Sequence, residues 1–297
     1  MRSFDPESIP TKDLHAILLS TVAPRPIAWA STVDEKGNPN LAPFSFFNVF
    51  SSNPPVMIFS PALRVRDNTG KHTLANVLDT GECVINICNY ALRDQMAITS
   101  AEYEDGVNEF LKAGLTMAPS VKVRPPRVLE APAQYECRVH DVIKLGDSGG
   151  AGNLIVCEVV YVHLNENVFG EDGKIDPVKV DNIARLGYNW YTRANASLFE
   201  MDNPKATPEM GFDKLPSHIA ESHYLTGSEI ARLTKSPYRP TKEEVEMVKE
   251  STGMRDIYDK YGRDKVELRA KVHTLAKNLL GDDKVEEAWQ VLMSYED

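Results

Sequence analysis

The sequence predicts a mainly β protein with some helix: an antiparallel barrel followed by a helical C-terminal extension. Two observations lead to this fold class. About six β-rich apolar runs lie within the first ~165 residues, and helical patterns do not alternate with them as a parallel α/β sheet requires. The end of the chain then changes to highly charged sequence with helical spacing. We therefore expect two domains, a barrel over residues 1–210 and a helical extension over 211–297.

Each element of the barrel follows from a local pattern. A helix is expected over 11–22, a second over 71–81 that Gly81 closes, and a third over 91–100. Strands are expected where β-branched and aromatic residues gather between turn signals, over 26–33, 40–50, 53–61, 82–88, 134–145 and 153–164. The last two of these strands flank a glycine-rich turn and predict a hairpin.

The extension contains helix signals of its own. Thr241 and Glu244 have the spacing of a capping box. Gly281 is expected to end a later helix, and Asp282 to cap the helix that follows it. Within the later helix, apolar residues recur at helical spacing at Leu268, Val272, Leu275 and Leu279. Because this apolar stripe is narrow and its flanks carry mixed charge, we expect it to pack against the barrel or a partner subunit.

The charge of the chain excludes some partners. The 297 residues carry a formal net charge of -10, and the pI is about 5.3. Such a chain is poorly suited to nonspecific binding of nucleic acid or of an anionic membrane. The sequence shows no apolar run of the ~20 residues that span a bilayer and no signal peptide at its start, so a cytoplasmic location and no membrane partner are expected.

Three other motifs are expected to be structural. Gly146–Gly150 reads Gly-Asp-Ser-Gly-Gly, like the nucleophile loop of chymotrypsin-type proteases, but the histidine context of such enzymes is absent, and a flexible hairpin turn is expected. His218 and His223 are five residues apart, which is poor spacing for a metal site on one helical face, and no metal is expected. Small buried hydrophobes are expected at Cys83, Cys88, Cys137 and Cys157.

Two segments carry groups suited to a flat, phosphorylated ligand. Asn68–Thr73 brings hydroxyls, a glycine and a cation to the start of a predicted helix, where phosphate is favoured; an ordinary helix cap is the alternative. Pro43 interrupts the apolar run Ala42–Ser45, and a broken β-ladder leaves backbone groups free for the polar edge of a heterocycle. An irregular edge strand without a ligand is the alternative for this run.

Together these segments resemble the flavin reductase-like, FMN-binding split-barrel family, which includes flavoredoxins and the reductase components of two-component monooxygenases. The resemblance extends from about residue 11 to residue 204. It rests on four motifs in the order of the family: Pro-Arg-Pro-Ile-Ala at 24–28, Asn-x-Ala-Pro-Phe-Ser at 40–45, Ser-x-x-Pro-Pro at 51–55, and Ala-Arg-Leu-Gly at 184–187 with Tyr191.

The resemblance implies FMN as cofactor, with FAD as the alternative flavin, and gives each candidate residue a role. The phosphate arm would contact Ser31, Thr32, Lys71 and Thr73, with Arg25 as a further cation. The isoalloxazine would lie against backbone groups of Ala42, Pro43, Phe44 and Ser45, and Ser51 would hydrogen-bond the ring or the ribityl chain. The family usually has Asp where this chain has His72, so His72 would add a pH-dependent cation if it contacts the phosphate.

The resemblance also implies an activity. A nicotinamide cofactor, NADH or NADPH, would reduce the flavin transiently, and the electrons would pass to a small-molecule or protein acceptor. Because no Gly-x-Gly-x-x-Gly fingerprint is present, the nicotinamide would be held in the flavin cleft. A homodimer with the flavin near the subunit interface is expected. Two alternatives stay open: an electron carrier that a partner protein reduces, and a barrel that binds no flavin.

Overall fold

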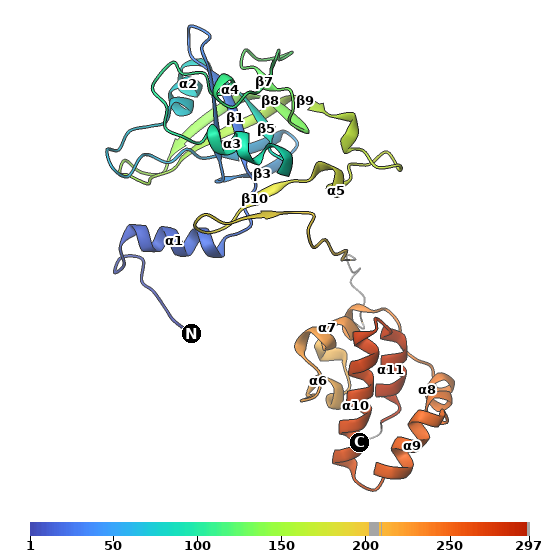
Figure 1. Ribbon diagram of the computed structural model, residues 1–297. Helices are drawn as coiled ribbons and strands as arrows, with labels where there is room; N and C mark the ends of the chain where they lie inside the picture. Colours follow the sequence, from blue (N-terminus) through green and yellow to red (C-terminus); the bar gives the residue numbers. More distant parts are fainter. Residues whose placement is uncertain (202–207, 209, 296–297) are drawn as a thin grey trace. The chain divides into compact units, whose positions relative to one another are not determined.

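The computed structural model describes residues 1–201, 208 and 210–295 of the chain. It divides into two compact units, Met1–Phe199 and Glu200–Asp297 (Figure 1). The sequence placed the corresponding boundary after residue 210. In the parts of the chain that the structure describes, no helix is both long and apolar enough to cross a membrane.

The N-terminal unit is built on one antiparallel sheet of seven strands. The strand order is β2-β1-β5-β8-β9-β4-β3, so the long hairpin predicted from the glycine-rich turn lies at the middle of the sheet. The bounds of these strands are β1 Ala28–Val33, β2 Pro39–Phe44, β3 Phe47–Ser52, β4 Pro55–Phe59, β5 Glu82–Ile87, β8 Ala133–Lys144 and β9 Asn153–Leu164.

The sheet curls but does not close into the barrel that the sequence predicted. Strands β2 and β3 form its two edges, although Ser45 and Phe46 are the residues that separate them in the chain. The edges must therefore meet at this corner, because so short a connection spans about 11 Å at most. Phe46 leaves the ladder here, since its carbonyl accepts the Ser60 N–H (2.9 Å), and no described residues pair β2 with β3.

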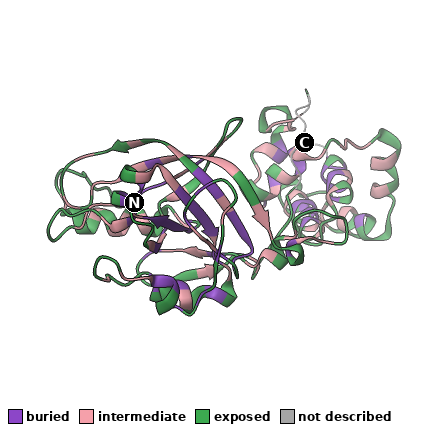
Figure 2. Ribbon diagram, turned by 90° about the horizontal axis from the view of Figure 1, so that it is seen from above, coloured by how far each residue is buried: buried purple, intermediate pink, exposed green. Residues whose placement is uncertain are grey.

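Alternation along β1 builds a core on each face of the sheet. Ala28 and Ala30 pack with Phe59 and Ile85 on one face, whereas Trp29 packs on the other. Figure 2 shows the buried residues concentrated along these strands. The indole N–H of Trp29 donates to Thr99 (2.8 Å), and all four cysteines are buried free thiols, in agreement with their predicted role as small core residues.

Short elements surround the sheet. Helix α2 (His72–Thr80) ends at Gly81, whose φ of 68° suits a residue without a side chain, as predicted. Helix α1 (Thr11–Thr21) contains no buried residue. The remaining elements of this unit are η1 Tyr90–Leu92, α3 Arg93–Ile98, α4 Glu109–Lys112, β6 Met117–Ala118, β7 Arg127–Val128, η2 Glu166–Val168, α5 Pro177–Val180, β10 Ile183–Arg185 and β11 Tyr191–Arg193.

The C-terminal unit is helical, as the sequence predicted, and has its own apolar core. Leu268 and Val272 are buried there, and the indole N–H of Trp289 donates to the carbonyl of Leu233 (3.0 Å). The prediction for Asp282 was wrong, because the residue before the last helix is Lys284. Its elements are η3 Phe212–Lys214, α6 Ser217–Ala220, α7 Gly227–Lys235, α8 Lys242–Lys249, α9 Thr252–Tyr261, α10 Lys265–Gly281 and α11 Val285–Met293.

Candidate flavin site

The structure distributes the predicted site residues over two pockets and the interior of the sheet. The first, here called the α2 pocket, is lined by Asn40, Ala42, Pro43, Arg64, Lys71, His72, Thr73, Glu109 and residues 99–103. The second, here called the α1 pocket, is lined by residues 21–26, 45–48, Phe50, Ile58, Ser60 and Leu154. Five of the predicted residues therefore meet in the α2 pocket, and Arg25 and Ser45 meet in the α1 pocket.

The α2 pocket contains a helix N-terminus without a cap. Lys71 occupies the N-cap position, and no side chain accepts a hydrogen bond from the first turn of α2. Among the described residues, the backbone N–H groups of His72 and Thr73 have no hydrogen-bond partner. Free N–H groups and the helix dipole together favour an anion at this point. The predicted cap from Asn68 or Thr69 does not form.

Two cations border these free N–H groups. The Lys71 ammonium lies 5.0 Å from the ring centroid of Phe44, and it forms no hydrogen bond or ion pair with any residue that the structure describes. Burial, and then the positive charge of Arg64, lower its pKa. Arg64 donates to the Thr69 hydroxyl (2.9 Å) and the Gly70 carbonyl (2.6 Å), and Glu102 lies 3.4 Å from its Nε. Arg64 thus holds the loop before α2 and adds positive charge.

A chain of hydrogen bonds supports the start of α2 from below. The Thr73 hydroxyl donates to Asn40 Oδ1 (2.8 Å), and Asn40 Nδ2 donates to Glu109 Oε1 (2.8 Å). The other carboxylate oxygen of Glu109 accepts the Leu41 N–H (3.0 Å). Burial raises the pKa of Glu109, although these hydrogen bonds act in the opposite direction. The Thr73 hydroxyl is therefore directed into the protein, and its backbone N–H is the group that remains for a ligand.

The edge position of β2 exposes further backbone groups beside this pocket. Ala42 and Pro43 lie on β2, which pairs with β1 on one side and has no strand on its other side. An edge strand presents unpaired N–H and C=O groups, which can bind the polar rim of a flat ligand. Phe44 is buried and packs on Phe59, with 5.3 Å between the ring centroids, so it anchors this segment.

The α1 pocket has a different chemistry. It is an open depression of about 1160 Å³, a volume that includes open solvent. Phe46, Phe47 and Phe50 contribute apolar walls, and Arg25 and Ser45 contribute polar groups. Burial, followed by the charge of Arg185, lowers the pKa of Arg25. Arg25 was expected to act as a phosphate cation, but it lies in this pocket and does not line the α2 pocket.

The Ala-Arg-Leu-Gly motif at 184–187 holds the residues before β1. Arg25 and Arg185 exchange backbone hydrogen bonds of 2.9 and 2.8 Å. Gly187 lies so close to α1 that a Cβ there would clash with Ser20, which explains the requirement for glycine. The Arg185 guanidinium donates to the Tyr191 hydroxyl and lies 4.5 Å from the centre of its ring.

Ser31 and Thr32 are buried inside the sheet and line neither pocket. The Ser31 hydroxyl donates to the carbonyl of Pro126 (2.6 Å), and the Thr32 hydroxyl accepts from Asn76 (3.0 Å). Ser51 lies on β3, next to a bulge, and also lines neither pocket. The flavin contacts assigned to these three residues stay predictions.

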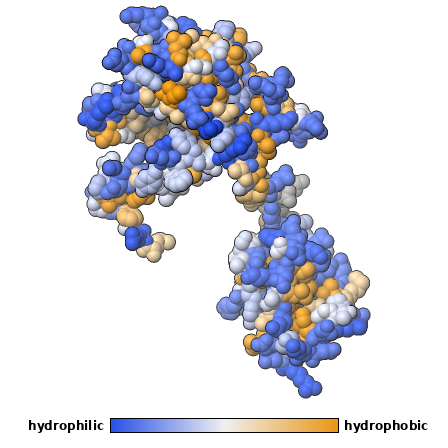
Figure 3. All heavy atoms as spheres, in the orientation of Figure 1, coloured by the Kyte–Doolittle hydropathy of each residue, from blue (hydrophilic) through white to orange (hydrophobic). Residues whose placement is uncertain are grey.

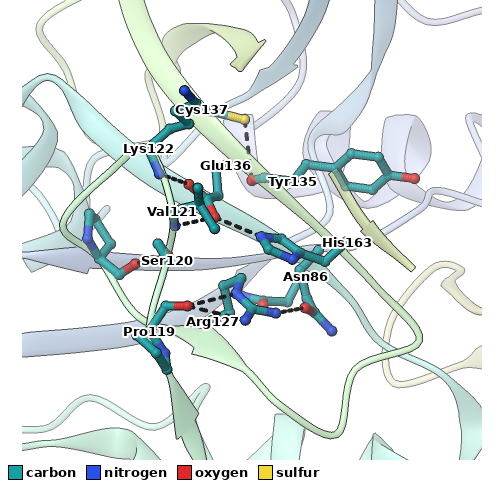
Figure 4. A network of polar contacts seen from close by, with 12 residues as sticks. Asn86, Pro119, Ser120, Val121, Lys122, Arg127, Tyr135, Glu136, Cys137 and His163 are labelled. Carbon is teal, nitrogen blue, oxygen red and sulfur yellow. Dashed lines mark hydrogen bonds and ion pairs between the residues drawn. The ribbon is translucent and has the colours of Figure 1, made fainter. Parts of the chain in front are cut away.

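The loop that contains Pro126, whose carbonyl accepts the Ser31 hydrogen bond, is held in place by the buried carboxylate of Glu136 (Figure 4). Glu136 accepts the backbone N–H groups of Val121 (2.7 Å) and Lys122 (2.5 Å), and His163 Nε2 lies 2.7 Å from its Oε1. Burial alone would raise the pKa of Glu136, but these hydrogen bonds outweigh it and hold the pKa below its usual value. This network stabilises the loop.

Comparison with known proteins identifies the family. The family model described as "Flavin reductase like domain" matches residues 20–192, more than half of the chain. This chain belongs to that family. The match includes both pockets and ends before the C-terminal helical unit. Membership supports a flavin-related oxidoreductase role.

Relatives and solved structures each cover about two thirds of this flavin reductase-like chain. An uncharacterized protein of Aquifex aeolicus is 39% identical over 181 residues, which are 61% of this chain and 90% of the relative. Nitrilotriacetate monooxygenase component B from Bacillus cereus is 30% identical, with a TM-score of 0.63 over 68% of this chain and 98% of that one. Flavoredoxin of Desulfovibrio vulgaris shares the fold, at 21% identity and a TM-score of 0.54, covering 67% of this chain and 97% of that one.

Sequence reasoning missed every residue of the α2 pocket except the five predicted ones, and three of the missed residues show why. Arg64 lies seven positions before Lys71, and the Arg-x-Arg that precedes Asp67 in an acidic chain was a signal of local positive charge. Asn40 was part of a quoted motif but received no role. Glu109 had no signal in the sequence, because its contact with Asn40 joins segments that are 69 residues apart.

Proposed function

We propose that this protein is an NAD(P)H-dependent oxidoreductase that binds FMN, with its phosphate in the α2 pocket. The observation that carries the proposal is the uncapped start of α2, where two free backbone N–H groups, Lys71 and Arg64 face one pocket. In a chain of net charge -10, such a site is matched to an anionic group.

The residues present fit FMN. Backbone N–H groups of His72 and Thr73 would bind the terminal phosphate, and Lys71 would neutralise its charge. The isoalloxazine would lie along the free edge of β2, from Ala42 to Ser45, where backbone groups meet its polar rim. A terminal phosphate is present in FMN and absent from riboflavin, so the α2 pocket favours FMN over riboflavin.

Bound flavin supplies hydride and electron transfer, which no side chain of the protein can supply. The residues of the protein bind and orient the flavin. Pro43 keeps the edge of β2 free, because a residue without an N–H disfavours pairing with a further strand. The buried Phe44 anchors the segment Ala42–Ser45 against the core. The nicotinamide would reach the flavin within the same cleft.

We further propose that the protein is a homodimer. Val49 and Phe50 on β3 are 56% and 63% exposed, and Leu18 and Val22 at the end of α1 are 50% and 63% exposed. Figure 3 shows such apolar side chains reaching the surface of the N-terminal unit. A second copy that covers these side chains would remove them from water.

An absorbance experiment tests the proposed activity. The protein is mixed with FMN and desalted, and anaerobic NADH or NADPH is then added. A retained flavin band that bleaches with either nicotinamide is the expected result. A retained band that does not bleach favours the electron carrier, and loss of all flavin on desalting would contradict the assignment of the α2 pocket.

A further inference from the structure

The α1 pocket contains two buried polar atoms without a partner. Arg25 and Ser60 both line it, and they are 6% and 7% exposed. Within the described part of the chain, neither Arg25 Nε nor Ser60 Oγ forms a hydrogen bond. Leaving such a group unpaired costs about 1–3 kcal/mol, so a ligand in the pocket that both atoms reach by a small side-chain rotation would recover this cost.

The charge of Arg25 also lacks a counter-ion. Its Nη1 donates to the carbonyls of Leu19 (2.5 Å) and Val22 (2.9 Å), and its Nη2 donates to the carbonyl of Leu186 (3.1 Å). These acceptors are neutral, and among the described residues no carboxylate forms an ion pair with Arg25. A buried guanidinium is usually paired with an anion, so the missing partner is an anion.

Nearby charge strengthens this requirement. Arg185, joined to Arg25 by backbone hydrogen bonds, donates to the Tyr191 hydroxyl and the Tyr188 carbonyl. It too forms no ion pair with a carboxylate in the described chain. The end of α1 offers its carbonyl groups to Arg25, but these carry partial charges only. Among the described residues that line the pocket, Arg25 is the one charged side chain.

The walls define the rest of the ligand. Phe46, Phe47 and Phe50 line the pocket together with Ile58 and Leu154. Aromatic and aliphatic walls select a flat apolar body, whereas a strongly hydrated dianion such as a phosphate would lose its water here without enough donors to replace it. One carboxylate group has two oxygens to accept from a guanidinium N–H and a hydroxyl.

We propose that the α1 pocket binds a small aromatic carboxylate, with the carboxylate at Arg25 and Ser60 and the ring between the phenylalanine side chains. The pocket shares Ser45 with the segment assigned to the isoalloxazine. The ligand is therefore a second reactant beside the flavin, and this role, unlike the binding itself, rests on the proposed function.

Calorimetric titration of the full chain with three probes tests the site. Benzoate has the ring and the charge, benzamide lacks the charge, and cyclohexanecarboxylate lacks the flat ring. Benzoate should bind at least about tenfold more tightly than benzamide, because its carboxylate forms a charge-assisted hydrogen bond. It should also bind more tightly than cyclohexanecarboxylate. Equal affinity for benzoate and benzamide would overturn the proposal.

Variants assign the binding to this pocket. Ser60→Ala removes one partner with little change in volume and is expected to weaken benzoate binding about three- to tenfold. Arg25→Gln is expected to abolish the preference for benzoate over benzamide; circular dichroism verifies its fold, and Ser60→Ala keeps the test valid if that variant does not fold. Arg64→Gln is the matched control, since it removes a cation from the α2 pocket and is expected to leave benzoate binding unchanged. Unchanged benzoate binding in Ser60→Ala would contradict the proposal.

Repeating the titration with saturating FMN separates this inference from the proposed function. Benzoate binding that persists with FMN bound supports a second site. Benzoate binding that FMN abolishes would overturn it, because the flavin itself would then occupy the α1 pocket. If benzoate binds but FMN does not, the proposed function is wrong, and the assignment of the α1 pocket as a carboxylate site is still supported.

Discussion

Two helix starts in this chain are built in opposite ways. At α8, Thr241 accepts the N–H of Glu244 (3.2 Å) and Glu244 accepts the N–H of Thr241 (2.7 Å), so the helix satisfies its own end groups. At α2, Lys71 supplies no cap, and the N–H groups of His72 and Thr73 remain free. Side-chain caps are also absent at α1, α3, α6, α9 and α11, so a missing cap alone does not mark a site. The start of α2 differs because it lines a pocket together with Lys71 and Arg64, where its free N–H groups favour an anionic ligand.

The difference predicts that removing charge at α2 affects ligand binding more than folding. Lys71→Gln is expected to weaken FMN binding about 10- to 100-fold, the worth of a charge-assisted hydrogen bond, and to change the free energy of unfolding by less than about 1 kcal/mol. Flavin fluorescence quenching and urea denaturation measure the two effects. Lys36→Gln, at an exposed turn, makes the same charge change and serves as the control. A Lys71 variant that binds FMN normally would contradict the comparison.

The hydrogen-bond chain beneath α2 is expected to be structural. In Glu109→Gln an amide NH₂ would face the N–H of Leu41 or the NH₂ of Asn40, so the free energy of unfolding should fall by about 1–3 kcal/mol. Urea denaturation measures the loss. Glu104→Gln, which changes an exposed carboxylate in the preceding loop, should have no comparable effect. Equal stability of the two variants would show that the hydrogen bonds joining Thr73, Asn40 and Glu109 do not support α2.

The Glu136 network predicts a pH dependence. Because the folded state holds the pKa of Glu136 below its usual value of 4.5, its ionised form stabilises the fold above that pH. This contribution is lost as pH falls through the folded-state pKa. The stability difference between the protein and Glu136→Gln should therefore narrow below about pH 4.5. Denaturation curves between about pH 3 and pH 7 measure it, and a difference that widens in acid would contradict the assignment.

The smallest expected effect is at the capped helices. Thr241→Ala, and separately Thr226→Ala in the equivalent capping box of α7, should each lower the free energy of unfolding by about 1 kcal/mol. FMN affinity should not change in either variant. A loss of flavin from a cap variant would show that the C-terminal unit contributes to the flavin site.

Local chemistry explains what could be predicted from the sequence. Gly81 and the Thr241–Glu244 box were predicted correctly because each acts within a few residues. The role of Glu109 and the acceptor of Ser31 could not be predicted, because their partners lie 69 and 95 residues away and are brought near by the folded sheet. The strand order that places β2 and β3 at the two edges of the sheet could not be predicted for the same reason.

Parallel titrations of the full chain with FMN and riboflavin test the central claim most directly, since the two ligands differ by the phosphate alone. The uncapped, cationic start of α2 predicts that FMN binds at least about tenfold more tightly than riboflavin, and that Lys71→Gln reduces this ratio while leaving the riboflavin affinity unchanged. Equal affinities for the two flavins in the unaltered protein would contradict the assignment of the α2 pocket as a phosphate site.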